Sequence, residues 1–155
     1  MKFCMEANFM KMKNEDLILD SNVLIAFVNT SDNLHVKSVS VMKETSFRKK
    51  IISDLIFAEI GTVLLMKTKQ TRLVSGSLRD ILFGKVENIQ VSTLTKHLLA
   101  QTLEIFSQQK HSRLSFEDCS VIALARSLRI RKIVTFDKAL RMAFAKEFEF
   151  LPKNI

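Results

Sequence analysis

The chain has 155 residues, 47% of them hydrophobic, which is enough for one domain of ordinary size with its own apolar core. Twenty-four Lys and Arg against 16 Asp and Glu give a net charge of +8, and this favours a polyanionic partner. The three glycines, Gly61, Gly76 and Gly84, are too far apart to build a dinucleotide-binding fingerprint or a P-loop. These two classes of nucleotide site are therefore excluded.

The N-terminal stretch MKFCMEANFMKMK carries charges where a secretory signal needs an apolar segment, and Cys4 and Cys119 form no C-x-x-C pair. The longest uninterrupted apolar run, 23–28, is far shorter than the roughly 18 residues that suggest a membrane span. We therefore expect a reduced, cytoplasmic protein that does not cross a membrane. Residues 1–15 show no clear periodicity, so we predict an N-terminal extension followed by a single domain over 16–155.

From residue 17 onward, short apolar runs alternate with longer segments of helical periodicity. Strands are predicted at 17–19, 51–52, 89–91, 133–134 and 148–151. Helices are predicted at 22–28, 33–47, 54–69, 73–84, 93–109, 115–128 and 138–145, with Asp54 and Ser115 as candidate caps. The apolar residues of the strands are continuous rather than alternating, as in strands buried on both faces. This pattern indicates an α/β fold, in which helices cover both sides of a parallel sheet.

Four acidic residues occupy positions that need an explanation. Asp20 and Asp137 each follow a predicted strand, whereas Glu59 and Asp118 lie on the apolar faces of their predicted helices. Carboxylates rarely face a core unless they are paired or bind a metal. Because strand ends and helix starts meet at the same edge of such a sheet, all four side chains can converge there.

Converging carboxylates repel one another, which raises some of their pKa values unless a divalent cation neutralises them. A ligand set of oxygens alone suits Mg²⁺ or Mn²⁺. Each residue also has an ordinary explanation: Asp20 and Asp137 could cap the helices that follow them, Asp118 could complete a capping box with Ser115, and Glu59 could pair with a lysine. We favour a shared acidic site, because four independent coincidences are improbable.

The segments around these residues resemble the four acidic motifs of PIN-domain ribonucleases, particularly the VapC-type toxins of bacteria and archaea. They are LILDSNVLIA at Asp20, SDLIFAEIGTVL at Glu59, LSFEDCSVIALA at Asp118 and KIVTFDKAL at Asp137. The resemblance extends from about Leu17 to Leu151, and the D-x-N of Asp20 and Asn22 and the T-x-D of Thr135 belong to it. The extension before the first strand departs from the family pattern, in which this aspartate lies close to the N-terminus.

The resemblance implies a three-layer fold with a five-stranded sheet of order 3-2-1-4-5, and a metal-dependent endoribonuclease whose products carry a 5′-phosphate and a 3′-hydroxyl. It implies that Asp20, Asp118 and Asp137 hold Mg²⁺ or Mn²⁺ directly or through water. Glu59 either completes that set or orients the attacking water as a base. It also implies a small antitoxin as partner and a homodimer.

Neutral and basic residues complete the expected site. Asn22, Thr135 and Ser115 are suited to hold carboxylates or a phosphate oxygen in place. The candidates for contacts with RNA phosphates are Lys37, Arg79, Lys85 and Lys96. Two further basic clusters, at 48–50 and 129–132, precede strands and are expected at the opposite edge of the sheet, solvated or in contact with a partner.

Two other functions remain open at this stage. One is a non-catalytic RNA- or protein-binding module that keeps the PIN-like fold, although carboxylates at all four positions argue against it. The other is a phosphatase with an aspartate nucleophile, as in haloacid dehalogenase-like enzymes. Those enzymes usually carry a second aspartate two residues later, where this chain has Asn22.

Overall fold

A computed structural model describes residues 15–86 and 88–155. The helices are α2 (Ser21–Val28), α3 (His35–Glu44), α4 (Asp54–Thr68), α5 (Thr71–Leu82), α6 (Lys96–Ser107), α7 (Phe116–Leu128) and α8 (Lys138–Phe144). The strands are β1 (Leu17–Leu19), β2 (Lys50–Ser53), β3 (Ile89–Ser92), β4 (Lys132–Val134) and β5 (Glu149–Leu151). The expected extension, apart from Glu15, lies outside the described residues. No helix among the described residues is long and apolar enough to span a membrane.

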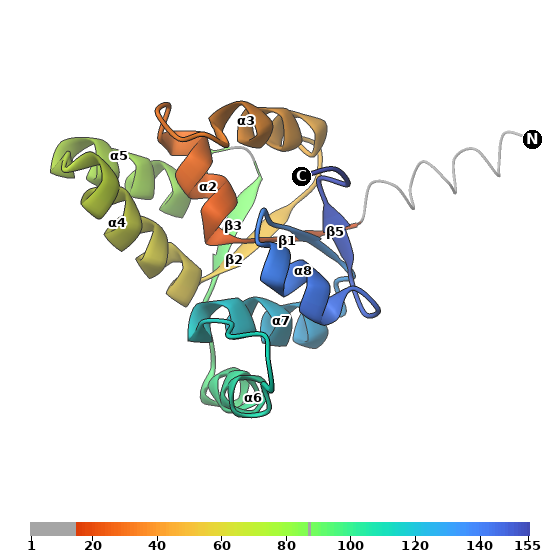
Figure 1. Ribbon diagram of the computed structural model, residues 1–155. Coiled ribbons are helices and arrows are strands. Elements are labelled where there is room, and N and C mark those ends of the chain that lie inside the picture. Colours follow the sequence, from red (N-terminus) through yellow and green to blue (C-terminus); the bar gives the residue numbers. More distant parts are fainter. Residues whose placement is uncertain (1–14, 87) are drawn as a thin grey trace, which may run out of the picture.

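The five strands form one sheet of order β3-β2-β1-β4-β5, and every neighbouring pair is parallel. This confirms the predicted α/β class and strand order. The central strand β1 is completely covered, with Ile18 only 1% exposed, and Ile18 pairs in register with Ile51 and Ile133. Helices α2 and α3 lie on one side of the sheet and α6 and α7 on the other (Figure 1). The apolar character of all three layers explains why the strands read as continuous rather than alternating runs.

Helix α7 is the most deeply buried helix of the described chain. Every residue from Cys119 to Ala125 is buried, and the helix packs against β1, β2, α4 and α6. A helix that is apolar on all sides needs cover on all sides, which α6 provides on the face away from the sheet. The start of α7, where Asp118 lies, is thereby fixed relative to the end of β2, as a contact of 3.4 Å between the Ser53 and Ser120 hydroxyl oxygens also shows.

Of the two predicted helix caps, Ser115 is confirmed and Asp54 is wrong. Ser115 caps α7 as expected, but the cap of α4 is Ser53, whose hydroxyl accepts a hydrogen bond from the Ile56 amide at 3.1 Å. Asp54, the predicted cap, is the first residue of the helix. Its carboxylate instead accepts from the Leu94 amide at 3.2 Å and so ties the loop after β3 to α4. A serine at the end of a strand is an equally good cap, so the sequence alone did not distinguish the two positions.

One residue of the 48–50 cluster is not solvated as expected, whereas Lys49 is exposed. Lys50, the first residue of β2, is completely buried, and its Nζ donates to the carbonyl oxygens of Thr45 at 2.7 Å and Arg48 at 3.1 Å. These carbonyls belong to the end of α3 and the turn that follows it, where backbone acceptors lack helical partners. Lys50 therefore supplies hydrogen bonds to backbone carbonyls at the end of α3 and is not part of a solvent-exposed basic surface.

Helices α4 and α5 follow each other without an intervening strand and pack together, and Gly61 of α4 lies against α5. A Cβ atom added to Gly61 would stand 3.0 Å from Cδ1 of Leu78 in α5. A Cβ added to Gly76, also within α5, would meet nothing within 4 Å. The absence of a side chain at Gly61 therefore leaves room for Leu78, whereas at Gly76 a side chain would meet no neighbour.

We expect Gly76→Ala to raise the free energy of unfolding by about 0.5–1 kcal/mol, because alanine restricts the unfolded chain and favours helix. Gly61→Ala should gain the same propensity but force Leu78 to shift, leaving it at least about 0.5 kcal/mol less stable than Gly76→Ala. Urea denaturation of the two variants measures this difference. An equal gain in both variants would show that the packing of α4 on α5 tolerates a methyl group at Gly61.

Candidate functional site

The four predicted carboxylates come from four different elements at the carboxyl edge of the sheet. Asp20 follows β1 and caps α2, Asp137 caps α8 after β4, Glu59 lies in the second turn of α4 and Asp118 in the first turn of α7. Asp118 and Glu59 both act electrostatically on Asp20, and Asp137 acts on Asp118. The structure therefore brings Asp118 and Glu59 near Asp20, and Asp137 near Asp118, at the edge of the sheet where the topology placed them.

Asp20 is the most buried of the four, with 1% of its surface exposed. Its Oδ1 accepts from the Ser21 amide at 2.7 Å. Its Oδ2 accepts from the Thr135 hydroxyl at 2.6 Å and from Nδ2 of Asn22 at 2.9 Å. Both oxygens are thus held by donors from α2 and from the segment after β4, which fixes the orientation of the carboxyl group.

Thr135 and Asn22 connect Asp20 to Asp137. The Thr135 hydroxyl oxygen accepts from the Asn22 side-chain amide at 3.1 Å and from the backbone amide of Asp137 at 2.9 Å. The side-chain oxygen Oδ1 of Asn22 in turn accepts a hydrogen bond from the Phe136 backbone amide at 3.0 Å. One threonine and one asparagine therefore join the ends of two neighbouring strands, which is the positioning that the sequence suggested for them.

Burial, together with the smaller effect of the nearby carboxylates of Asp118 and Glu59, raises the pKa of Asp20 from 3.8 to about 7. The hydrogen bonds from Thr135 and Ser21 favour the ionised form but do not overcome the loss of hydration. Burial likewise raises the pKa values of Glu59 and Asp118, opposed by a hydrogen bond from Ser21 to Glu59 and by bonds from Ser115 to Asp118. The site thus holds several acids whose ionisation is unfavourable.

Asp118 and Asp137 also perform the capping roles that were considered as ordinary explanations. Oδ2 of Asp118 accepts from the Ser115 amide at 2.8 Å, and the Asp118 amide donates to the Ser115 hydroxyl at 3.0 Å, which completes the capping box. Oδ1 of Asp137 accepts from the Leu140 amide at 2.9 Å. Capping and membership of the acidic cluster therefore coexist in the same residues.

Within residues 15–86 and 88–155, no Lys or Arg forms an ion pair with Asp20, Glu59, Asp118 or Asp137. The same residues contain no group of three or more His, Cys, Asp or Glu side chains arranged so as to hold a metal. The donor chemistry and the unbalanced charge fit a hard divalent cation. Asp20, Asp118 and Asp137 each turn a carboxylate oxygen toward a backbone amide.

One acidic residue of this cluster, Glu117, was not predicted from the sequence. Glu117 raises the pKa values of both Glu59 and Asp118 by charge repulsion, so it lies close to both. Its position directly before Asp118 in the first turn of α7 was the available signal. It was not selected because it does not fall on the apolar stripe of the helix.

Arg141 is a second missed residue, and it holds the backbone of Thr135. Its Nε and Nη2 donate to the Thr135 carbonyl oxygen at 3.0 and 2.6 Å. Because it follows Asp137 by one helical turn, α8 places it against the end of β4. Arg141 thus fixes the main chain of the residue whose hydroxyl joins Asp20 to Asp137.

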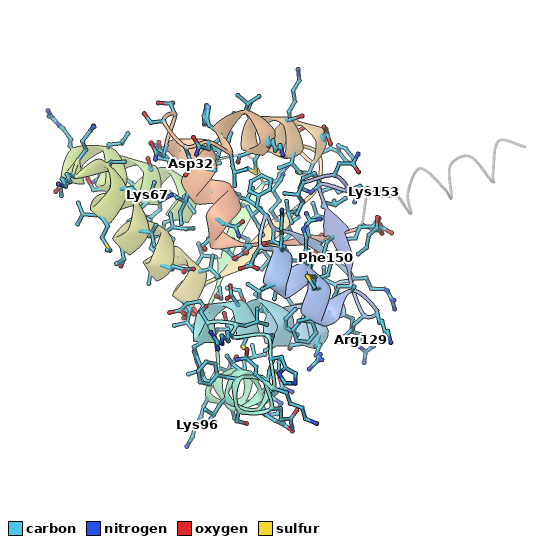
Figure 2. All side chains as sticks on the ribbon, viewed as in Figure 1. Asp32, Lys67, Lys96, Arg129, Phe150 and Lys153 are labelled. Atoms are coloured by element: carbon cyan, nitrogen blue, oxygen red, sulfur yellow. The ribbon has the colours of Figure 1, made fainter. Side chains whose placement is uncertain are left out.

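The four basic residues proposed to contact RNA are not gathered around the carboxylates. Lys37 lines a groove of about 490 Å³ between α3 and the C-terminal residues, whereas Lys85 lines a different groove of about 420 Å³ beside α3. Lys96 projects outward from the start of α6 (Figure 2). Arg79 is exposed on α5. Figure 2 also places Arg129 at the end of α7 opposite to Asp118, as predicted for its cluster.

Comparison with known proteins gives a consistent result. Residues 17–144 match the family model of the PIN domain, and no curated protein matches the chain in sequence. Among solved structures, the Mycobacterium tuberculosis toxin VapC20, which cleaves the sarcin-ricin loop, superposes with a TM-score of 0.74 at 20% identity over 83% of this chain and 95% of that one.

Two further solved structures are similar. VapBC2 of Rickettsia felis, bound to a DNA fragment from its promoter, gives a TM-score of 0.60 at 12% identity over 86% of this chain and 96% of that one. PAE2754 of Pyrobaculum aerophilum gives a TM-score of 0.57 at 18% identity over 87% of this chain and 90% of that one. The segment matched by the family model contains all four carboxylates and most of the chain. The chain therefore belongs to the PIN-domain family.

Proposed function

We propose that this protein is a metal-dependent endoribonuclease that hydrolyses RNA phosphodiester bonds with Mg²⁺ or Mn²⁺. The observation that carries the proposal is the buried carboxyl group of Asp20, whose pKa is raised to about 7 beside two further acids. No basic side chain of the described residues pairs with it. A structure retains such a costly group where function requires it, and clusters of perturbed carboxyls are typical of active sites.

In this proposal Asp20, Asp118 and Asp137 hold the cation, directly or through water, and Glu59 either joins them or accepts a proton from the attacking water. A bound divalent cation supplies positive charge that offsets the carboxylates and the scissile phosphate and makes a nearby water more acidic. Glu59 suits the proton-accepting role because burial raises its pKa above the ordinary value while its side chain is only partly buried. By family analogy, cleavage leaves a 5′-phosphate and a 3′-hydroxyl.

The neutral residues of the site keep these acids in place. Thr135 and Asn22 donate to Asp20, and Arg141 fixes the Thr135 carbonyl, so the ends of β1 and β4 stay in register during catalysis. Ser115 holds Asp118 through the capping box. In this proposal Lys37, Arg79, Lys85 and Lys96 act at a distance, because their positive charge draws RNA toward the molecule.

We further propose that the protein is the toxin of a toxin–antitoxin pair, acts in the cytoplasm, forms a homodimer and is neutralised by a small antitoxin. The support is the fold shared with VapC20 and with VapBC2, which is a toxin–antitoxin complex bound to promoter DNA. A short reading frame beside the gene, encoding a DNA-binding N-terminus, is the expected source of the antitoxin.

A non-catalytic RNA-binding module is the second candidate, and one observation favours it. Asp118 and Asp137 accept hydrogen bonds as helix caps, and the described carboxylates do not form a ready metal cage. An aspartate-nucleophile phosphatase is less favoured. Both oxygens of Asp20 accept hydrogen bonds and its side chain is buried, which suits a held ligand better than an attacking group.

We expect Asp20→Asn and Asp118→Asn each to lower the rate of RNA cleavage at least about 100-fold, because each removes a negative charge needed to hold the cation. The measurement is cleavage of a structured RNA mixture by the purified full-length protein in Mg²⁺, in Mn²⁺ and in EDTA. Glu44→Gln is the matched control, since Glu44 is an exposed acid at the end of α3 and should leave the rate unchanged.

Cleavage that persists in EDTA, or full activity of Asp118→Asn, would rule out the proposed mechanism. RNA binding without any cleavage by the wild type would support the non-catalytic module. Turnover of small phosphate esters through an acyl-phosphate on Asp20 would support the phosphatase.

We also expect the metal-free protein to lose stability as the pH rises. The folded pKa of Asp20, about 7, exceeds the unfolded value of 3.8, so the folded state binds the proton more tightly and its stability falls as the pH rises toward 7. Between pH 5.5 and 8 this group alone should lower the free energy of unfolding by about 2 kcal/mol. Urea denaturation in EDTA at several pH values measures the slope.

The raised pKa values of Glu59 and Asp118 act in the same direction. Asp32 and Glu147, whose pKa values are lowered, are ionised in both states above pH 5.5 and do not contribute to this slope. Asp20→Asn should therefore flatten the pH profile, and Mn²⁺ should stabilise the wild type more at pH 8 than at pH 5.5. Stability that increases steadily over this range would contradict the assignment of Asp20 as an uncompensated buried acid.

A further inference from the structure

The loop between α6 and α7 leads directly into the capping box of Asp118, and one side chain within the loop makes most of its hydrogen bonds. Gln109 lies in the second position after α6, and its side chain is partly buried between the loop and the start of α7. It was not among the predicted site residues, since no motif contains it. Its contacts nevertheless connect three parts of the chain.

The Gln109 side-chain oxygen accepts two hydrogen bonds. The Leu114 amide donates to Oε1 at 2.6 Å, and the Ser112 hydroxyl donates to it at 2.9 Å. Its nitrogen faces acceptors instead: Nε2 donates to the carbonyl oxygens of Phe106 at 3.2 Å and Leu114 at 3.1 Å. Because backbone amides only donate and carbonyls only accept, these partners fix which way the Gln109 amide group points.

The same nitrogen lies 3.7 Å from Sγ of Cys119. The sulfur of a thiol is a weak hydrogen-bond acceptor. Leu114 directly precedes Ser115, and Cys119 directly follows Asp118. Gln109 therefore contacts both residues that flank the box in which Ser115 and Asp118 hold each other.

The last turn of α6 is the third part of the chain that Gln109 reaches. The Phe106 carbonyl belongs to that turn, where helical acceptors lack partners, and Nε2 of Gln109 satisfies it. The Phe106 ring also packs edge to face on the Phe116 ring, with centroids 5.7 Å apart. Side-chain contacts thus tie the end of α6 to the beginning of α7.

We propose that Gln109 is a positioning residue for Asp118, which it keeps at the acidic edge by fixing the loop before the capping box. This inference rests on the proposed function in that it assigns Asp118 to cation binding. Groups that orient a metal ligand commonly change metal affinity by 10- to 100-fold when they are removed. A loop released from Gln109 lets Ser115 move, and Asp118 moves with it.

The test compares Gln109→Ala with Gln108→Ala in the full-length protein. Gln108 is the preceding residue and of the same type, but it is exposed, and among the described residues its side chain donates only to Glu104 of α6. Gln109→Glu is the conservative variant, since it keeps the acceptor for the Leu114 amide and the Ser112 hydroxyl but loses every contact that Nε2 makes as a donor. Leu98→Ala, on the buried face of α6, controls for loss of stability alone.

Amide hydrogen exchange of the metal-free protein is the first measurement. Gln109→Ala should lower the protection of the Ser115 and Asp118 amides at least tenfold relative to wild type, because both amides are bonded within the box. Gln108→Ala should leave this protection unchanged. In Gln109→Glu the protection should be intermediate between that of Gln109→Ala and that of the wild type. Unchanged protection in Gln109→Ala would overturn the inference, whether or not the protein cleaves RNA.

Mn²⁺ affinity by calorimetry and RNA cleavage kinetics are the second measurement. Gln109→Ala should bind Mn²⁺ about tenfold more weakly and lose kcat with little change in KM, whereas Leu98→Ala should lower the melting temperature without changing the affinity. Equal Mn²⁺ affinity in Gln109→Ala and wild type would show that Gln109 has only a structural role. Absence of Mn²⁺ binding and RNA cleavage in the wild type would instead overturn the proposed function, and the exchange data would still decide what Gln109 holds.

Discussion

The buried carboxyl group of Asp20 is the constraint on which the rest of the site depends. It lies at the end of the central strand, with only 1% of its surface exposed, and no basic side chain of the described residues balances it. Its oxygens are satisfied by Ser21, Asn22 and Thr135, so the ends of β1, α2 and β4 must keep a fixed geometry. Arg141 extends this network to α8. The local architecture is thus organised around an acid that water does not reach.

The surrounding core explains both why this acid is costly and why it can be held accurately. The sheet is covered on both faces, and the seven consecutive buried residues of α7 leave the start of that helix little freedom to move. A low-polarity environment raises the pKa of Asp20, but it also strengthens each hydrogen bond that orients the carboxyl group. The proposed active site therefore reduces stability at neutral pH in return for a rigid arrangement of charges.

The sequence predicted those parts of the structure that depend on periodicity, and it failed where a single side chain chooses among several partners. Continuous apolar runs located all five strands, and strand ends located Asp20 and Asp137, because these signals follow from burial alone. Whether Ser53 or Asp54 caps α4 depends on local geometry that both residues satisfy. Glu117 was not predicted, because its effect on Glu59 and Asp118 depends on their proximity in space rather than on a sequence pattern. The hydrogen bonds of Gln109 could not be predicted either, because a single glutamine in a polar loop belongs to no recognisable sequence motif.

The double use of Asp118 and Asp137 is physically consistent with the proposed chemistry. An ionised carboxylate offers about four lone-pair directions, and the described capping bonds use one each, so further acceptor capacity remains. Both residues also lie at the positive ends of their helices, and this partial positive charge offsets part of the repulsion within the cluster. The net charge of +8 attracts RNA to the molecule as a whole, whereas the carboxylate edge by itself repels phosphate. In the proposed mechanism a cation bound at that edge would reverse the local sign, so the same cluster that weakens the fold would make productive RNA binding depend on the metal.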